Sequence, residues 1–190
     1  MKTEVTPKEK LLQTAAHLYY QHGYRSIGVD TIAAESGIGK MTLYRHYPSK
    51  DDLIVAYLNA SNRLFWEQFE QITITAPTAR EKIVAFFDAL QDYVLSPACY
   101  GCPFINVAAE YPEAGYAGHQ VALEHKQSVL ARFRQLAEEA GARQPESVAN
   151  ALFLLMDGAY VAARMFGPSP NSPAVSLVET ARQVLEVNLV

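Results

Sequence analysis

The sequence has little of what several protein classes require. Its 190 residues include two cysteines, too few for the disulfide framework of a small secreted domain. The longest apolar runs, residues 53–58 and 151–156, are far shorter than the roughly 20 residues of a membrane span. The amino terminus lacks the apolar stretch of a secretory signal. We therefore expect a cytoplasmic protein with no membrane association.

Positive charge is also scarce overall, with 16 Lys and Arg against 20 Asp and Glu and a net charge of −4. The charges are unevenly placed, however. Residues 1–50 carry seven basic and four acidic groups, a balance of +3, and the remainder carries nine and sixteen, a balance of −7. A basic head on an acidic body favours one orientation on a polyanion. A protein that coats DNA regardless of sequence would be basic throughout, so this class is disfavoured.

Residues for catalysis are not grouped in any familiar pattern. We find no nucleophile–base pair, no metal-ligand cluster and no cofactor motif, and therefore predict a protein that is not an enzyme and holds no cofactor or metal. With 49% hydrophobic residues, the chain can still bury a substantial core.

The sequence contains a series of helix-start motifs and helical apolar repeats, and we find no strand pattern in it. Capping boxes at Thr6, Ser49 and Thr78 each precede residues with helical apolar spacing. The spacing predicts helices over about 7–22, 29–36, 40–47, 49–72, 79–95, 103–111, 118–140, 145–166 and 173–188. The helix over 145–166 is apolar on nearly every side, which predicts burial all round. In the helix over 118–140, Leu123, Leu130, Phe133 and Leu136 define the expected apolar face.

The two short helices within residues 29–47 have the pattern of a helix-turn-helix. Ile32 supplies the apolar edge of the first helix, and Gly37 stands where the turn needs a positive φ. Leu43 and Tyr47, four residues apart, share the inward face of the second helix. The intervening polar side chains are then left for solvent or for the major groove of DNA. A plain helical hairpin in an all-α core is the alternative.

The run containing Ile32-Ala33, Gly37-Ile38, Thr42-Leu43-Tyr44, His46-Tyr47 and Ser49-Lys50 resembles the DNA-binding domain of tetracycline-repressor (TetR/AcrR) family regulators. The segment from Gly101 to Asn106, with Ala109-Glu110, is similar to one branch of that family. The resemblance implies an all-α chain, with a three-helix DNA-binding domain over 1–48 and a helical ligand-binding and dimerisation domain over 49–190. It also implies a transcriptional regulator, which we expect to be a repressor released from operator DNA by a small molecule.

For DNA contact we select residues on the second helix of the motif and at neighbouring helix starts. Lys40 could donate to guanine, and Met41 or the Thr42 methyl could touch a thymine methyl. The resemblance implies phosphate contacts from the tyrosine and the histidine of this helix. Alternatively, Tyr44 covers the core and Arg45 pairs with Asp51 or Asp52. The full predicted set is Thr31, Lys40, Met41, Thr42, Tyr44, Arg45, His46 and Lys50.

One such head makes few contacts, so we expect a homodimer that places two recognition helices one DNA turn apart. The last two helices are the predicted dimer surface, with intramolecular packing as the alternative. The residues chosen are Ala151, Leu155, Gly158, Ala159, Val161, Ala162, Ala163, Val175, Val178, Ala181 and Leu185.

The body of the chain is much larger than DNA binding requires, and the resemblance implies a ligand pocket there. Most aromatic residues at helical spacing are simply core, which is the alternative for each one. Polar groups within apolar helices are more informative, although Asp157 could instead pair with Arg164. If Glu110 and Asp157 face a cavity, a cationic ligand is favoured. The predicted lining is Trp66, Phe69, Phe86, Tyr93, Cys102, Asn106, Glu110, Met156, Asp157 and Tyr160.

Cys99-Tyr-Gly-Cys102 supports a rival interpretation. A Cys-x-x-Cys pair can act as a redox switch, and the chain would then be a helical thiol redox protein or a redox-sensing regulator. No basic residue adjoins these cysteines in sequence, so we favour Cys102 as a buried apolar contact.

Overall fold

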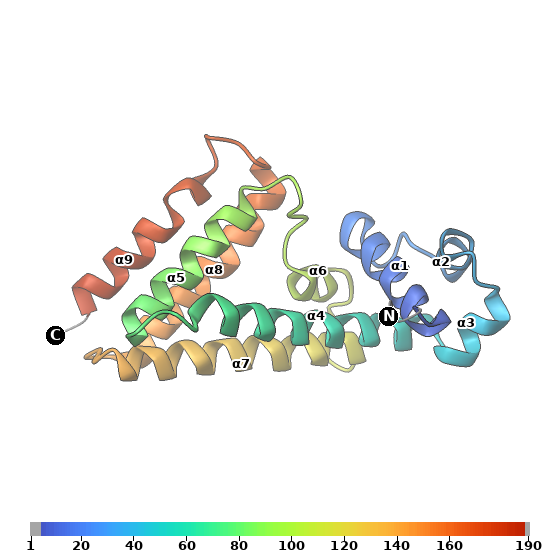
Figure 1. Cartoon of the computed structure of the whole chain (residues 1–190), viewed down its shortest axis with the longest axis horizontal. Helices are drawn as coiled ribbons and strands as arrows, with labels where there is room; N and C mark the ends of the chain where they lie inside the picture. Colours follow the sequence, from blue (N-terminus) through green and yellow to red (C-terminus); the bar gives the residue numbers. More distant parts are fainter. Residues whose placement is uncertain (1–4, 189–190) are drawn as a thin grey trace. The chain divides into compact units, whose positions relative to one another are not determined.

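The computed structural model describes residues 5–188, and this part of the chain is helical with no strand (Figure 1). The expected all-α fold is therefore confirmed. The helices are α1 (Pro7–His22), α2 (Val29–Ser36), α3 (Lys40–His46), α4 (Lys50–Thr73), α5 (Ala79–Val94), α6 (Pro103–Glu110), α7 (Ala117–Glu139), α8 (Pro145–Phe166), the 3-10 helix η1 (Pro173–Ser176) and α9 (Leu177–Asn188).

Three helices begin where the capping boxes predict. The Thr6 hydroxyl accepts from the Glu9 amide at 3.3 Å, and the Glu9 carboxylate accepts from the Thr6 amide at 2.8 Å. Thr78 and Glu81 repeat this exchange ahead of α5. Ser49 and Asp52 do the same ahead of α4, at 2.9 and 3.0 Å. Each box satisfies amides that the first helical turn leaves without a partner.

The chain forms two compact units, and neither is continuous in sequence. Unit 1 contains residues 5–63 and 103–123, and unit 2 contains residues 64–102 and 124–188. The long helices α4 and α7 each contribute to both units. These units differ from the functional division at residue 48 that the sequence suggests, because α6 and its flanking residues belong with the amino-terminal helices.

Unit 1 is held together by the contacts of α1 with α2 and α3 (Figure 1). Leu11 on α1, Ile32 on α2 and Leu43 on α3 are fully buried there. Tyrosine rings extend this core: the Tyr19 ring centroid lies 5.4 Å from that of Tyr24 and 6.1 Å from that of Tyr57. Burial of each such side chain stabilises the fold by about 1.5–3 kcal/mol.

Unit 2 has its own core, in which α8 packs with α5 and α9 (Figure 1). Phe86 is at its centre, with ring centroids of Phe69, Phe87 and Phe133 at 5.2, 5.4 and 5.6 Å. Because Phe133 and Leu136 are fully buried, the predicted inward face of α7 is confirmed at these two residues. Leu123 is exposed, so its assignment to that face is wrong.

The predicted burial of α8 on every side is also wrong. Leu154 is 69% exposed and Met165 is 75% exposed, with the half-exposed Val161 between them. By length and composition alone α8 could span a membrane, yet its other face is buried against α5 and α9, as in the core helices of globular proteins. The sequence predicts burial on every side because an exposed apolar residue cannot be told from a core residue by its type.

Candidate nucleic-acid interface

The helix-turn-helix of unit 1 is built as its sequence predicts. Gly37 ends α2 with a φ of +64°, a left-handed conformation that glycine adopts at little cost. The Gly37 amide bonds to the Ala34 carbonyl at 3.1 Å and the Ile38 amide to the Ala33 carbonyl at 3.2 Å. These bonds close α2 and turn the chain into α3 within three residues, so the angle between the two helices is set locally.

Helix α3 is anchored on its inner side. Leu43 is fully buried and Tyr47, which caps the helix, is nearly so. The Tyr47 hydroxyl donates to the Lys8 carbonyl at 3.2 Å, which links the end of α3 to the start of α1. The side of this short helix that carries Met41, Tyr44 and Arg45 is presented to solvent.

The outward face carries the residues predicted to contact DNA. Met41 is 86% exposed, an unusual position for an apolar side chain, and Tyr44 and Arg45 are exposed as well. Thr42 and His46 are half-buried, and Thr31 on α2 is exposed. An apolar side chain held in water by a well-packed helix is suited to contact a thymine methyl in the major groove.

Lys40, the first residue of α3, forms an ion pair with Asp30 near the start of α2. Its Nζ lies 2.7 Å from Asp30 Oδ1, and both side chains are at least half exposed. The hydrogen bond and charge of Asp30 raise the pKa of Lys40. A guanine would therefore compete with the Asp30 carboxylate for the Lys40 ammonium. Asp30 was not among the residues that the sequence predicted at this site.

Lys50 lies at the start of α4 and is half-buried. Its Nζ donates to the Arg25 carbonyl at 3.5 Å, and burial lowers its pKa. Nearby, Asp51 accepts from the Tyr116 hydroxyl at 2.9 Å and Asp52 from the Ser49 amide. Each carboxylate thus already has a partner other than Arg45, the partner that the alternative hypothesis had offered.

The residues predicted to line a ligand pocket are distributed over both units. Asn106 and Glu110 belong to unit 1, where both are half-buried, and the others belong to unit 2. Phe69, Phe86 and Met156 are fully or nearly fully buried in the unit 2 core, which is the alternative foreseen for aromatic and apolar residues. Trp66 packs beside them, and the Tyr93 ring lies 6.5 Å from that of Tyr160.

Asp157 has a partner that the sequence analysis missed. Its carboxylate pairs with Lys126 on α7, and the expected pairing with Arg164 is therefore wrong. The Lys126 ammonium also lies 5.5 Å from the centre of the Phe153 ring. Both charged side chains are mostly covered, at 15% and 25% exposure, so each depends on the other for compensation. Lys126 and Asp157 are 31 residues apart and lie on different helices, so the spacing of residues along one helix cannot predict this pair.

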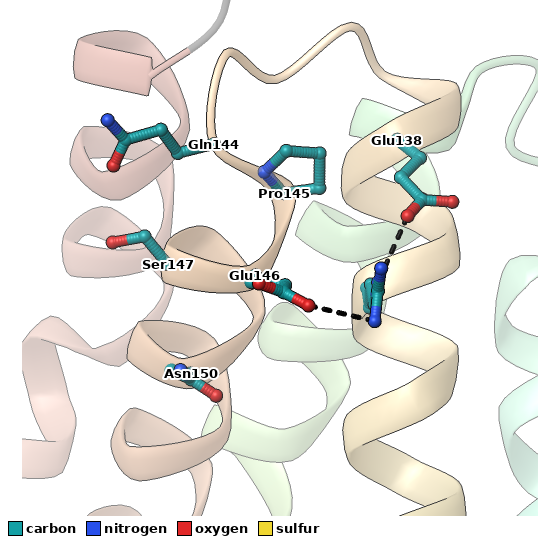
Figure 2. Close-up of a pocket in the computed structure, with 7 residues that line it drawn as sticks. Glu138, Gln144, Pro145, Glu146, Ser147 and Asn150 are labelled. Atoms are coloured by element: carbon teal, nitrogen blue, oxygen red, sulfur yellow. Dashed lines mark hydrogen bonds and ion pairs between the residues drawn. The ribbon is translucent and has the colours of Figure 1, made fainter.

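A pocket of about 550 Å³ lies at the surface of unit 2, between the end of α7 and the start of α8 (Figure 2). It is lined by polar groups, and Arg134 pairs there with Glu138 at 3.1 Å and with Glu146 at 2.9 Å. None of the predicted ligand-binding residues lines this pocket.

The two cysteines are differently placed. Cys102 is 4% exposed, consistent with an apolar contact, and Cys99 is half-buried against the unit 2 core. Burial raises the pKa of the Tyr160 hydroxyl, and negative charge on either sulfur would raise it further. Among residues 5–188, no group of three or more His, Cys, Asp or Glu side chains is placed to hold a metal ion.

The predicted dimer surface is partly reassigned. Ala159, Ala162, Ala163, Ala181 and Leu185 are buried within their own unit, so their assignment to a dimer face is wrong. The exposed stripe on α8 instead follows a spacing of three and four residues. It contains Ser147, Asn150, Leu154, Gly158, Val161 and Met165, and we call it the α8 stripe.

Comparison with known proteins agrees with this architecture. Residues 11–57 match the family described as bacterial regulatory proteins, tetR family. The crystal structure of a TetR-family transcriptional regulator from Streptomyces coelicolor superposes with a TM-score of 0.89 at 32% identity, over 94% of each chain.

Two curated relatives match over part of the chain. An HTH-type transcriptional regulator of Staphylococcus aureus is 34% identical over 71 residues, which cover 37% of this chain and 38% of that protein. The HTH-type transcriptional activator FasR of Mycolicibacterium smegmatis is 29% identical over 85 residues, covering 45% and 39%. These alignments thus span well under half of either relative. From its folded helix-turn-helix and its structural match at 32% identity over 94% of the chain, the chain belongs to the TetR family of bacterial DNA-binding transcriptional regulators.

Proposed function

We propose that this protein binds a specific operator as a homodimer, with α3 of each protomer in the major groove. The observation that carries the proposal is the contrast on α3 between Met41, 86% exposed, and Leu43, fully buried two residues later. Within the amino-terminal division, residues 1–48, Lys40, Met41 and Thr42 at the start of α3 read bases. Thr31, Tyr44, Arg45, His46 and Lys50 contact the phosphate backbone.

Dimerisation is supported by the α8 stripe. Leu154, Val161 and Met165 form an exposed apolar row on a helix whose opposite face is already packed. A second copy of the same helix, related by a two-fold axis, would cover this row with an identical one. Such a dimer presents two recognition helices to half-sites roughly 34–36 Å apart.

We further propose that a small molecule bound by the larger helical part, residues 49–190, releases the protein from its operator. The support is that unit 2 forms a core of its own, well beyond what holds the helix-turn-helix together. The half-buried Trp66 and Tyr160, with the exposed Tyr93, are the side chains through which such a ligand would be recognised. Coupling of roughly 1–3 kcal/mol between the two sites is sufficient. Repression is our expectation, although one curated relative is named as an activator.

Selection from a random DNA duplex library tests the first proposal. The purified protein should enrich an inverted repeat whose half-sites are about one turn apart. Lys40→Ala and Met41→Ala should bind the enriched duplex more weakly, whereas Arg143→Ala, which removes an exposed charge from unit 2, should not. A library that shows no enriched sequence after repeated rounds would sink the proposal.

Release by a ligand is tested with the enriched duplex. Compounds that raise the unfolding temperature of the protein are collected, since a ligand that binds the folded state stabilises it. Each is then added to the protein–duplex complex while fluorescence anisotropy reports the bound fraction. Release should increase with compound concentration. Unchanged operator affinity for every stabilising compound would exclude this mode of control.

A further inference from the structure

Glu110, the last residue of α6, reaches back to the turn between α1 and α2. Its Oε1 accepts a hydrogen bond from the Tyr24 amide at 3.0 Å, and its Oε2 accepts one from the Arg25 amide at 2.6 Å. One carboxylate therefore binds two consecutive backbone amides from a position 86 residues away in sequence. Hydrogen bonds with a charged acceptor are stronger than those between neutral groups.

The backbone beside these amides is shaped to admit the carboxylate. Gly23 has a φ of +87°, and a Cβ built there would lie 2.8 Å from Glu110 Oε1. A real Cβ never approaches an oxygen so closely, so any larger residue would displace the carboxylate. The left-handed φ disfavours other residues independently. Gly23 thus ends α1 and also leaves room for Glu110.

Other contacts join the same two segments of unit 1. The Tyr24 hydroxyl donates to the Pro103 carbonyl, at the start of α6, at 2.8 Å. The Arg25 guanidinium lies 4.9 Å from the centre of the Tyr111 ring, directly after α6. The turn is thereby held at both ends of α6. The Glu110 bonds, by contrast, hold backbone amides of the turn itself.

The start of α2 has no comparable restraint of its own. Its N-cap is Gly28, which has no side chain to accept from the first helical amides. Packing against α1 holds α2 and α3 in unit 1, and the turn between α1 and α2 sets how the first turn of α2 leaves that packing.

We propose that Glu110 is a positioning residue for operator binding: it holds the turn that precedes the helix-turn-helix. The proposal rests on the proposed function, because it assigns Glu110 a role in presenting α3 to DNA. Glu110 itself makes no contact with DNA in this scheme.

The first test is independent of DNA. Amide hydrogen exchange is measured at Tyr24 and Arg25 in the full chain, in Glu110→Ala, in Glu110→Gln and in the control Glu113→Gln. Glu113 is an exposed carboxylate three residues further along. Exchange should rise about ten-fold or more in Glu110→Ala, less in Glu110→Gln, which retains one acceptor oxygen, and remain unchanged in the control. Exchange rates in Glu110→Ala equal to those of the wild-type protein would show that Glu110 does not hold the turn.

The second test uses the duplex that the wild-type protein enriches. At a temperature where circular dichroism shows each variant fully folded, Glu110→Ala should bind about ten-fold more weakly, with Glu110→Gln in between. The slope of affinity against salt should stay at its wild-type value, because no phosphate contact is removed. A role in stability alone predicts wild-type affinity for the folded variant, and that result would overturn the proposal.

A third variant keeps the test decisive if Glu110→Ala does not fold. Gly23→Ala should raise exchange at Tyr24 and Arg25 in the presence of Glu110, because its Cβ displaces the carboxylate. Glu110→Gln should then still show the graded loss of affinity. If the wild-type protein enriches no duplex, the operator role falls with the proposed function. The exchange measurements judge the Glu110 bonds separately.

Discussion

Lys40 Nζ and Asp30 Oδ1 lie 2.7 Å apart, so the lysine that we propose reads a base already holds a carboxylate. Asp30 is the second residue of α2, so its negative charge lies within the helix-turn-helix, beside the side chain that we propose contacts DNA. The pair is exposed, and salt screens it readily. We interpret Asp30 as a restraint on binding to DNA in general.

We predict that Asp30→Asn strengthens DNA binding and weakens discrimination between sequences. The substitution removes a repulsive charge and frees Lys40 for phosphates. Lys40→Ala should weaken operator binding by about ten-fold and relax the preference at one base pair. Anisotropy titrations against the enriched duplex and a scrambled duplex measure both effects. Equal ratios of the two affinities in wild type and Asp30→Asn would contradict this role.

The α8 stripe predicts the effect of a charge on self-association. Leu154→Glu should shift the protein to monomer, because each protomer would have to bury a carboxylate in the two-fold interface. Sedimentation velocity gives the state directly, and operator binding should fall along with dimer content. Ile74→Glu is the matched control, since Ile74 is 79% exposed in the same unit but lies outside the stripe. A dimeric Leu154→Glu would place the interface elsewhere.

His125 predicts how stability depends on pH. The imidazole is 4% exposed and stands edge-on to Phe65, with ring centroids 4.9 Å apart. Burial, with a smaller effect from the charge of Lys126, lowers its pKa to about 3. Between pH 3 and about 6.5 the unfolded chain therefore binds a proton that the folded chain does not. Stability is full above this range and is lost as pH falls through it, at up to about 1.4 kcal/mol per unit.

Urea unfolding at pH 7.5, 6.5 and 5.5 tests this slope. The free energy of unfolding of the wild-type protein should fall from pH 6.5 to 5.5. His125→Asn, which does not titrate, should fall less over the same interval, whatever its stability at pH 7.5. Parallel pH profiles would show that folding does not lower the pKa of His125.

The placement of the cysteines predicts that operator binding is insensitive to oxidation. Cys102 is buried, and a thiol without access to solvent reacts slowly with peroxide. Operator affinity should therefore be the same before and after mild peroxide treatment, and the same in Cys99→Ser. Loss of binding on oxidation that disappears in Cys99→Ser would favour the rival redox-sensing regulator.

The helix-turn-helix could be predicted from sequence because its determinants are local. The positive φ of Gly37 and the buried pair Leu43 and Tyr47 depend on residues within one or two turns of each other. Capping boxes are equally local, which is why the starts of α1, α4 and α5 agree with expectation.

Pairings between distant helices could not be read in the same way. Asp157 could pair with Lys126 on α7 or with Arg164 on its own helix. Spacing along the helix favoured Arg164, whereas the structure shows the pair with Lys126. Glu110 was noticed as a polar residue in an apolar helix, but nothing in its neighbourhood points to amides 85 and 86 residues earlier. On α8, composition shows that the helix is apolar and leaves open which face its own core will cover.

The Glu110 bonds also limit how this regulator can be cut and recombined. A fragment ending with α4 would contain the whole helix-turn-helix, yet the amides of Tyr24 and Arg25 would lose the carboxylate they bind. A chimaera that grafts this DNA-reading module onto a foreign sensor should therefore carry residues 103–123 with it, since the module is assembled from two stretches of the gene.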